Sequence, residues 1–311
     1  MEKAPTEKMT ARKPAQSDSV VLPVDPQDVH QIYQELADDV RMREQALADE
    51  VPVDATAKLA ALLEQVVTDW ESGRKSLRAV PVLTVYQNHL DEPVSDDIKC
   101  LLTGLDALIN VLDDIVDTPD APTELRIHLA FNAAIAPPLF WRHVPPVHAD
   151  ELGDLLMQYL VEVFQIPLVE NKLLDRFQAA DSRRQRLQTA RELYAYRARG
   201  MGAFAKIPAV VHDVDAETTS RIVGDLCAYR ARQLLFKDIH DVERDIRDDD
   251  ETPVSWLLEH EFEMAMITSF ISDLYGEFSY SEAGREAYGE LLYLLEGRPD
   301  DVEQLLIEQQ E

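Results

Sequence analysis

The sequence is poor in the residues that build disulfide frameworks, membrane spans and secretory signals. Its 311 residues include two cysteines, Cys100 and Cys227, too few for a disulfide framework or a cysteine-based zinc site. An uninterrupted apolar run of about 18 residues, which a membrane helix needs, is absent. Residues 1–22 also lack the apolar stretch of a secretory signal. We therefore expect a cytoplasmic protein with no integral membrane segment and a disordered leader over residues 1–22.

Positive charge is scarce, and lysine especially so. The chain has 30 Lys and Arg residues, of which nine are Lys, against 59 Asp and Glu residues, for a net charge of −29. Nucleic acids and anionic membranes attract proteins that carry clustered cations on an exposed face, so this balance argues against both as partners. Dense carboxylates keep a protein hydrated when salt screens their repulsion. We therefore expect a protein adapted to high salt.

Apolar residues recur at helical spacing, and β-type alternation is rare. The segment "QDVHQIYQELADDV" places Val29, Ile32, Tyr33, Leu36 and Val40 on one stripe. The same pattern predicts further helices over about 97–117, 123–140, 150–166, 168–180, 187–211, 217–247, 253–275 and 282–296. The prediction is an all-α protein: a single large helical bundle of about ten helices over 23–296, followed by an acidic C-terminal tail over 297–311.

An acidic cluster follows the most apolar of these helices. In "NVLDDIVDTPD", Asp113 and Asp117 lie one turn apart, and Asp114 is rotated by about 100° from Asp113, so the three carboxylates can converge on one site. An unpaired buried carboxylate must reach water, become protonated or meet a cation. In so acidic a chain the pattern also arises by chance, and a solvated acidic face is the alternative.

A second acidic cluster lies in "KDIHDVERDIRDDD". Asp238, Asp241 and Asp245 fall at i, i+3 and i+7, on one helical face. Two such faces on different helices can hold several hard divalent cations, and Mg²⁺, which prefers oxygen ligands and bridges carboxylates to phosphates, is the natural choice. The acids of 248–251 instead predict a solvated loop.

Arginines are concentrated between the two clusters, in "DSRRQRLQTARELYAYRARG". A phosphate-bearing ligand needs direct cations, and Arg197 and Arg199 stand beside Gly200 and Gly202, which permit close helix approach. We expect one of these two arginines to face the interior. Salt bridges to the abundant acids are the alternative for the other arginines.

Together these motifs resemble those of the class I isoprenoid synthases, and among them the trans-polyprenyl diphosphate synthases, over about 73–260. "GRKSLRAVPVLTV" is similar to the family's glycine, lysine and arginine stretch, which implies that Lys75 and Arg78 bind a diphosphate. "LDDIVD" matches the first aspartate-rich motif, and "KDIHDVERD" occupies the place of the second. The resemblance implies a bundle with a central cavity and a homodimer.

The chain also departs from that family. The Arg-Arg-Gly segment expected after the first motif is absent, and Lys237 stands where the second motif has its first aspartate. Asp245 can restore a third ligand there. The expected Lys-Thr pair near residue 200 is missing, with Arg197 or Arg199 as candidates for its charge.

The resemblance implies an Mg²⁺-dependent enzyme that uses an allylic prenyl diphosphate, with isopentenyl diphosphate as second substrate if the chain elongates prenyl groups. Without a second substrate, cyclisation, elimination or water capture follows ionisation. The alternative is a catalytically degenerate paralogue that acts as a non-catalytic partner subunit. Up to three Mg²⁺ ions are expected on Asp113, Asp114, Asp117, Asp238, Asp241 and Asp245, the first five of which would be catalytic. Diphosphate binding is expected from Lys75, Arg78, Arg197, Arg199 and Lys237.

Overall fold

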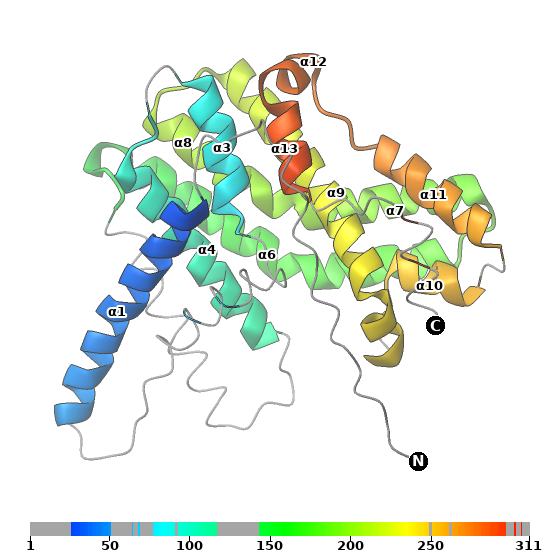
Figure 1. Ribbon diagram of the computed structural model, residues 1–311, viewed down its shortest axis with the longest axis horizontal. Coiled ribbons are helices and arrows are strands. Elements are labelled where there is room, and N and C mark those ends of the chain that lie inside the picture. Colours follow the sequence, from blue (N-terminus) through cyan, green and yellow to red (C-terminus); the bar gives the residue numbers. More distant parts are fainter. Residues whose placement is uncertain are drawn as a thin grey trace, which may run out of the picture. The chain divides into compact units, whose positions relative to one another are not determined.

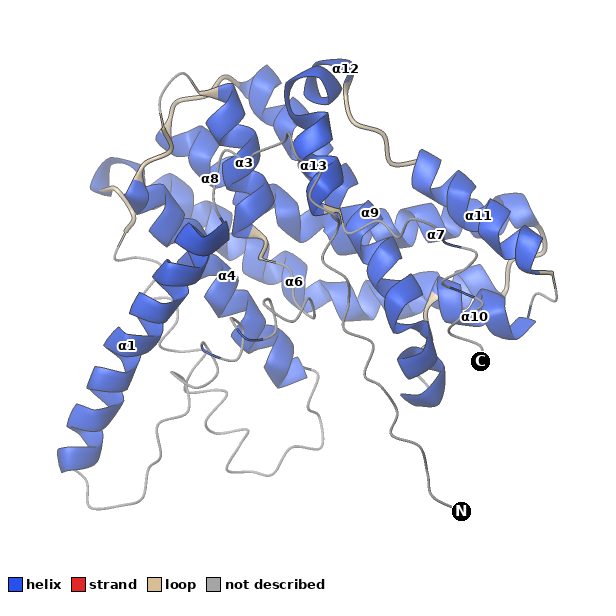
Figure 2. Cartoon of the chain, viewed as in Figure 1, coloured by secondary structure: helices blue, strands red, loops and turns tan. Residues whose placement is uncertain are grey.

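The computed structural model describes residues 26–50, 64, 68, 77–90, 93–116, 143–248, 251–260, 263–296, 302 and 306. Over these ranges the secondary structure is helical and contains no strand (Figure 2), so the predicted all-α class is confirmed. None of the described helices is both long enough and apolar enough to cross a membrane. The chain divides into two units, 1–144 and 145–311, where the sequence predicts one domain over 23–296. We describe each unit by itself.

Unit 1 is built from three helices that contact one another (Figure 1): α1 (Pro26–Glu50), α3 (Ala79–His89) and α4 (Asp96–Val116). In α1 the buried residues Val29, Tyr33 and Ala37 recur every four positions, as one helical stripe requires. In α4 the buried stripe comprises Ile98, Leu101, Leu102, Leu105 and Ile109. The predicted helix over 97–117 is confirmed within one residue at each end.

A buried ion pair joins α3 to α4 in unit 1. Asp106 of α4 is fully buried, and Arg78, at the start of α3, donates two hydrogen bonds to its carboxylate. The Arg78 guanidinium donates to Asp106 Oδ1 at 3.0 Å, and the Arg78 backbone N–H donates to Oδ2 at 3.1 Å. Burial raises the pKa of Asp106, and the Arg78 charge opposes that rise. The pair therefore fixes where α3 begins relative to α4.

Unit 2 is centred on a long helix, α9 (Ala216–Asp248), which contacts α7, α8, α10 and α12. Its other elements are η1 (Pro146–His148), α6 (Ala149–Gln178), α7 (Arg183–Arg197), η2 (Ala198–Gly200), α8 (Met201–Val211), α10 (Pro253–His260), α11 (Met264–Gly276), α12 (Glu282–Gly284), η3 (Arg285–Gly289) and α13 (Glu290–Leu295). The predicted helix over 217–247 is confirmed.

Three predicted boundaries in unit 2 are wrong. The segments 150–166 and 168–180 form one helix, α6, whose backbone continues through Pro167. The segment 187–211 is divided by the 3₁₀ turn η2, and 253–275 is divided into α10 and α11. Apolar spacing passes through such short turns without a break, which is why periodicity alone misses them. The segment 123–140 lies outside the described residues.

Aromatic side chains form much of the core of unit 2. Phe177 of α6 packs edge-on against Trp256 of α10 and Phe270 of α11, with ring centroids 5.4 and 6.1 Å apart. Leu306 is fully buried in the same cluster, and Val302 packs against it. The other residues of the predicted tail over 297–311 lie outside the described residues.

Two buried carboxylates tie residues 280–296 to α9. Asp225 accepts hydrogen bonds from the Ser281 backbone N–H at 2.6 Å, the Ser281 hydroxyl at 2.7 Å and the Tyr288 hydroxyl at 2.5 Å. Glu296 pairs with Arg232 at 3.0 Å and accepts a hydrogen bond from the Tyr280 hydroxyl. The Arg232 guanidinium also lies 4.5 Å from the centroid of the Tyr280 ring. Asp225 of α9 is thus bound from residues 281–288, and Arg232 of α9 binds Glu296.

Two glycines of unit 2 should respond in opposite ways to alanine. A Cβ atom at Gly284 would lie 2.1 Å from Asp225 Oδ2, which three donors hold in place, whereas nothing lies within 4 Å of a Cβ at Gly224 in the exposed interior of α9. Gly284→Ala should destabilise the protein by about 1–3 kcal/mol through overpacking. Gly224→Ala should stabilise it by about 0.5–1 kcal/mol through helix propensity. Urea denaturation followed by circular dichroism measures both, and equal effects would contradict the packing described for Gly284.

Removal of Arg78 should leave the buried Asp106 carboxylate without the cation that neutralises it. We expect Arg78→Ala to cost about 3–5 kcal/mol at neutral pH, because an uncompensated buried charge remains. Burial raises the pKa of Asp106, so the folded protein binds a proton on this carboxylate more tightly than the unfolded chain does. The loss of stability in Arg78→Ala should therefore shrink as the pH falls below the raised pKa, where the carboxylate becomes neutral. Urea denaturation at pH 7 and at pH 5 measures this. Asp106→Asn added to Arg78→Ala should recover most of the loss, and a large loss that persists in the double variant would contradict the pairing.

Candidate functional site

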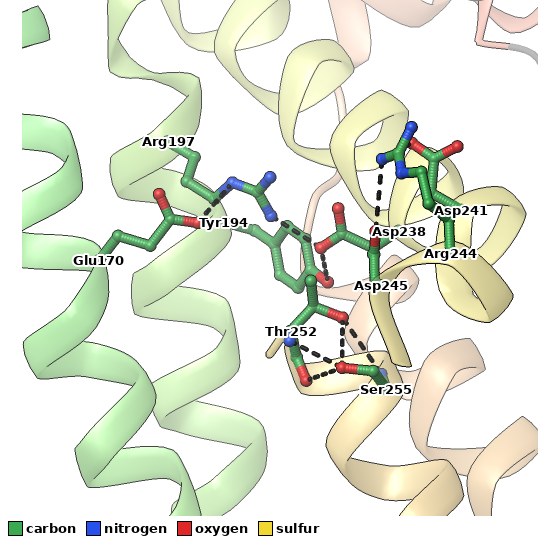
Figure 3. A network of polar contacts seen from close by, with 9 residues as sticks. All are labelled: Glu170, Tyr194, Arg197, Asp238, Asp241, Arg244, Asp245, Thr252 and Ser255. Carbon is green, nitrogen blue, oxygen red and sulfur yellow. Dashed lines mark hydrogen bonds and ion pairs between the residues drawn. The ribbon is translucent and has the colours of Figure 1, made fainter. Parts of the chain in front are cut away.

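The second acidic cluster forms one face of α9 near its C-terminal end (Figure 3). Asp238, Asp241 and Asp245 are spaced by three and four residues, so their side chains leave the helix on the same side. Asp238 and Asp245 are buried, whereas Asp241 is partly exposed. Buried carboxylates require partners, and the three aspartates have different ones.

Asp238 is held by two residues of α7. The Tyr194 hydroxyl donates to Asp238 Oδ2 at 2.8 Å, and the Arg197 guanidinium donates to the same oxygen at 2.7 Å. Arg197 also pairs with Glu170 of α6 at 3.1 Å, so the network joins α6, α7 and α9 (Figure 3). Burial and the Asp238 charge raise the pKa of Tyr194 well above its ordinary value, so its hydroxyl stays protonated and donates.

Asp241 and Asp245 share a different cation. One guanidinium nitrogen of Arg244, Nη2, lies 2.9 Å from Asp241 Oδ2 and 3.3 Å from Asp245 Oδ1. Arg244 belongs to α9 itself and lies one turn beyond Asp241. Partial burial lowers the pKa of Arg244, but the charges of Asp241 and Asp245 raise it by more, so this pKa lies above its ordinary value. The two carboxylates therefore converge on one cationic atom.

The two arginines differ in how firmly they are bound. The Arg197 side chain is 17% exposed, whereas that of Arg244 is 53% exposed. Exposed ion pairs contribute about 0–1 kcal/mol, whereas breaking a buried pair costs about 3–5 kcal/mol. Asp238 is therefore firmly held in its present contacts, whereas Arg244 is half-exposed and lies between a partly exposed carboxylate, Asp241, and a buried one, Asp245.

The N-terminus of α10 lies beside this network in Figure 3. The Thr252 hydroxyl accepts from the Ser255 backbone N–H at 3.1 Å, and the Ser255 hydroxyl accepts from the Thr252 backbone N–H at 2.8 Å. This reciprocal pairing satisfies two donors at the start of the helix. In the predicted acidic loop, Glu251 accepts a hydrogen bond from Gln178 at 2.6 Å, and residues 249–250 lie outside the described residues.

The remaining predicted cations of unit 2 have other surroundings, although the charges of Asp241 and Asp238 still act on Lys237. Arg199 is exposed and lies 3.7 Å from Glu162, in contrast to Arg197, which faces Asp238. Together with Lys206 and Cys227, Arg199 lines a pocket of about 210 Å³ formed by α6, α8 and α9. Burial raises the pKa of Cys227 to about 11, so its thiol stays protonated. Lys237 is exposed on α9.

The predicted residues of unit 1 are described only in part. Asp113 and Asp114 lie in the last turn of α4, but their side chains are outside the described residues, as are Asp117 and Lys75 altogether. Arg78, predicted to bind diphosphate, pairs with the buried Asp106. The structure therefore gives Arg78 a structural partner that the sequence did not suggest.

Metal binding requires several ligand side chains grouped around one point. Within the part of the chain that the structure describes, no three His, Cys, Asp or Glu side chains are grouped so as to hold a metal ion. Asp241 and Asp245 nevertheless direct one oxygen each at a single cationic nitrogen, as two ligands of a cation would. Carboxylate oxygens are the donors that Mg²⁺ prefers, but the Arg244 guanidinium occupies these two.

Sequence reasoning found the acidic face but missed the roles of Glu170, Tyr194 and Arg244. Arg244 was detectable, because it follows Asp241 at i+3 within the motif. The partners of Asp238 come from α7, and Glu170 of α6 reaches the network through Arg197, so no spacing rule within α9 identifies them.

Loss of the Tyr194 hydroxyl should weaken the hold on Asp238. We expect Tyr194→Phe to cost about 1–3 kcal/mol, because a buried carboxylate loses one of its donors. Tyr196→Phe is the matched control: Tyr196 lies on the same helix with its ring under the Arg199 guanidinium, and it should change stability by less than about 0.5 kcal/mol. Urea denaturation of both variants makes the comparison. A Tyr194→Phe variant as stable as Tyr196→Phe would show that the hydroxyl does not support Asp238.

Comparison with known proteins adds no relative. No protein-family model matches the chain, and neither a curated protein nor a solved structure matches it. Any assignment of function to the chain therefore depends on its own residues and on the geometry given above.

Proposed function

We propose that the chain is an Mg²⁺-dependent enzyme that acts on an allylic prenyl diphosphate. The observation that carries the proposal is the acidic face of α9: two buried carboxylates and one partly exposed carboxylate, with arginines bound to them from two helices. This arrangement offers oxygen ligands to a cation and guanidinium groups to an anion within one site. A metal-bound diphosphate is a ligand that needs both.

The pattern of α4 supports the same proposal. Its buried apolar stripe leads directly to Asp113 and Asp114 in its last turn, and Asp117 follows. In the proposal these three aspartates bind Mg²⁺, as the second acidic face does. A bound Mg²⁺ would supply electrostatic stabilisation of the negative charge that develops on a departing diphosphate.

The chain's own cations have graded roles in the proposal. Arg197 is directed at the acidic face, although, like Arg78, it is already paired there, with Asp238 and Glu170. Arg199 faces the pocket with Lys206, Lys237 is exposed on α9, and Arg78 is paired with Asp106. The site therefore favours ionisation of one prenyl diphosphate over condensation of two, since Arg78, one of the two cations expected for a second diphosphate, already has a partner.

A second candidate is a non-catalytic partner protein, and one observation favours it. Each carboxylate of the α9 face has an arginine within 3.3 Å, so the helix carries no unneutralised aspartate at this position. An acidic face that is complete without a ligand can serve purely to hold helices together.

Calorimetric titration separates the two candidates. A non-hydrolysable farnesyl or geranylgeranyl diphosphate analogue is titrated into the protein in high KCl, with and without Mg²⁺. The proposal expects binding that requires Mg²⁺ and that Asp113→Ala or Asp241→Asn weakens at least about tenfold, since each variant removes a charged metal ligand. Glu243→Gln, an exposed carboxylate of α9 outside the acidic face, is the matched control and should leave the affinity unchanged.

The outcomes differ between the candidates. Mg²⁺-dependent binding that survives in Glu243→Gln but not in Asp241→Asn supports the enzyme. Absence of binding with or without Mg²⁺, in a protein that is folded by circular dichroism, contradicts the enzyme and favours the non-catalytic partner.

A further inference from the structure

The pocket of about 210 Å³ formed by α6, α8 and α9 contains none of the carboxylates on which the proposed function rests. Arg197 and Arg199 are two residues apart, which places their side chains roughly on opposite sides of a helix. Arg197 therefore faces Asp238, while Arg199 faces this pocket. The pocket shares no lining residue with the acidic face of α9.

Two glycines set the spacing of the pocket walls. A Cβ atom at Gly200 would lie 3.2 Å from the Tyr159 ring, so this glycine lets η2 approach α6 closely. A Cβ atom at Gly202 would lie 3.5 Å from Val223 and 3.9 Å from Cys227, which are ordinary contact distances. Gly202 therefore leaves open a space in the pocket that a methyl group would fill without a clash.

Two cations and one carboxylate line the pocket. Glu162 accepts a hydrogen bond from Gln158 at 3.0 Å and lies 3.7 Å from the Arg199 guanidinium. Lys206 is partly buried, and in the part of the chain that the structure describes it has no hydrogen bond or ion pair. In a protein with a net charge of −29, the pocket thus keeps one positive charge that no carboxylate neutralises.

The three charges act together at the Cys227 thiol. Burial raises the pKa of Cys227 to about 11 and the Glu162 charge adds to the rise, whereas the charges of Lys206 and Arg199 oppose it. Both cations are therefore near one point inside the pocket. Because the thiol stays protonated, it forms a weakly polar wall, and Leu155 and Val223 line the pocket as well.

Size and charge together define the ligand that this pocket fits. A cavity of about 150 Å³ in a protein can hold benzene, so this pocket has room for a body of that size and a charged group. One unneutralised cation suits a monoanion, since the second charge of a phosphate dianion would be repelled by Glu162. We propose that the pocket binds a small organic carboxylate with a compact apolar body, and that Lys206 and Arg199 hold its carboxylate.

Ligand-observed NMR with benzoate as the probe tests the inference. Benzoate is titrated into the full-length protein at one KCl concentration, without Mg²⁺ or a prenyl ligand, and should bind with a dissociation constant of about 1 mM or below. Benzamide has the same body without the charge, and inorganic phosphate has the charge without the body. Each should bind at least about fivefold more weakly than benzoate.

Charge variants assign the binding to the pocket. Lys206→Gln should weaken benzoate binding at least about fivefold, because the unpaired cation is lost. Lys172→Gln is the matched control: it removes the same charge from an exposed position of α6 outside the pocket and should change the affinity by less than about twofold. Glu162→Gln should strengthen binding roughly threefold, because it removes the carboxylate that repels the ligand.

Gly202→Ala tests the volume of the pocket. The added methyl group meets its neighbours at ordinary distances, so the variant should fold, yet it occupies space that the apolar body needs. We expect about threefold weaker benzoate binding and an unchanged circular dichroism spectrum. Unaltered affinity in this variant would place the ligand elsewhere.

Benzoate binding that Lys206→Gln weakens and Lys172→Gln does not would support the inference. Absence of benzoate binding to the folded protein, equal binding of benzamide or phosphate, or equal loss in both lysine variants would overturn it. Because the titrations contain neither metal nor diphosphate, they test this pocket independently of the proposed enzyme. A protein that binds benzoate as described but no prenyl diphosphate analogue would contradict the enzyme alone.

Discussion

The arrangement of unit 2 depends on the cost of burying the Asp238 carboxylate. A buried charge is tolerated only with close partners, and here both partners come from α7 while the carboxylate comes from α9, and Glu170 of α6 in turn binds Arg197. Three helices must therefore be correctly placed before the charge is satisfied. That requirement sets the direction in which α9 presents Asp241 and Asp245, one and two turns further along.

The same solution recurs wherever the described chain buries a carboxylate beside a cation. Asp106 pairs with Arg78 in unit 1, while in unit 2 Asp238 pairs with Arg197, Glu296 with Arg232 and Asp245 with Arg244. In each case the cation is arginine, although the chain also has nine lysines. The planar guanidinium offers several donors in fixed geometry and loses less hydration on burial than an ammonium group does. High acidity therefore does not prevent burial of charge, provided that arginine supplies the partner.

The sequence predicted helices and faces better than it predicted partners. Period 3.6 placed α4 and α9 within one residue and put Asp238, Asp241 and Asp245 on one face, because both are properties of a single helix. It did not divide 187–211 at η2, since the apolar pattern continues through the turn. It also could not pair Arg78 with Asp106 or Arg197 with Asp238, because such contacts depend on how separate helices pack. Predictions that fall on 117–142 lie outside the described residues and stay predictions.

Salt distinguishes the two arginines of the acidic face. At about 1 M ionic strength the Debye length is about 3 Å, so exposed pairs weaken while buried ones are little affected. Arg244 would then lose part of its hold on Asp241, whereas Arg197 would keep Asp238. Arg244 nevertheless keeps a second partner, Asp245, whose carboxylate is buried and therefore little screened. Salt thus weakens one of the two contacts of Arg244 and neither contact of Arg197 with its buried partner, because burial and not the kind of side chain decides how strongly a pair is screened.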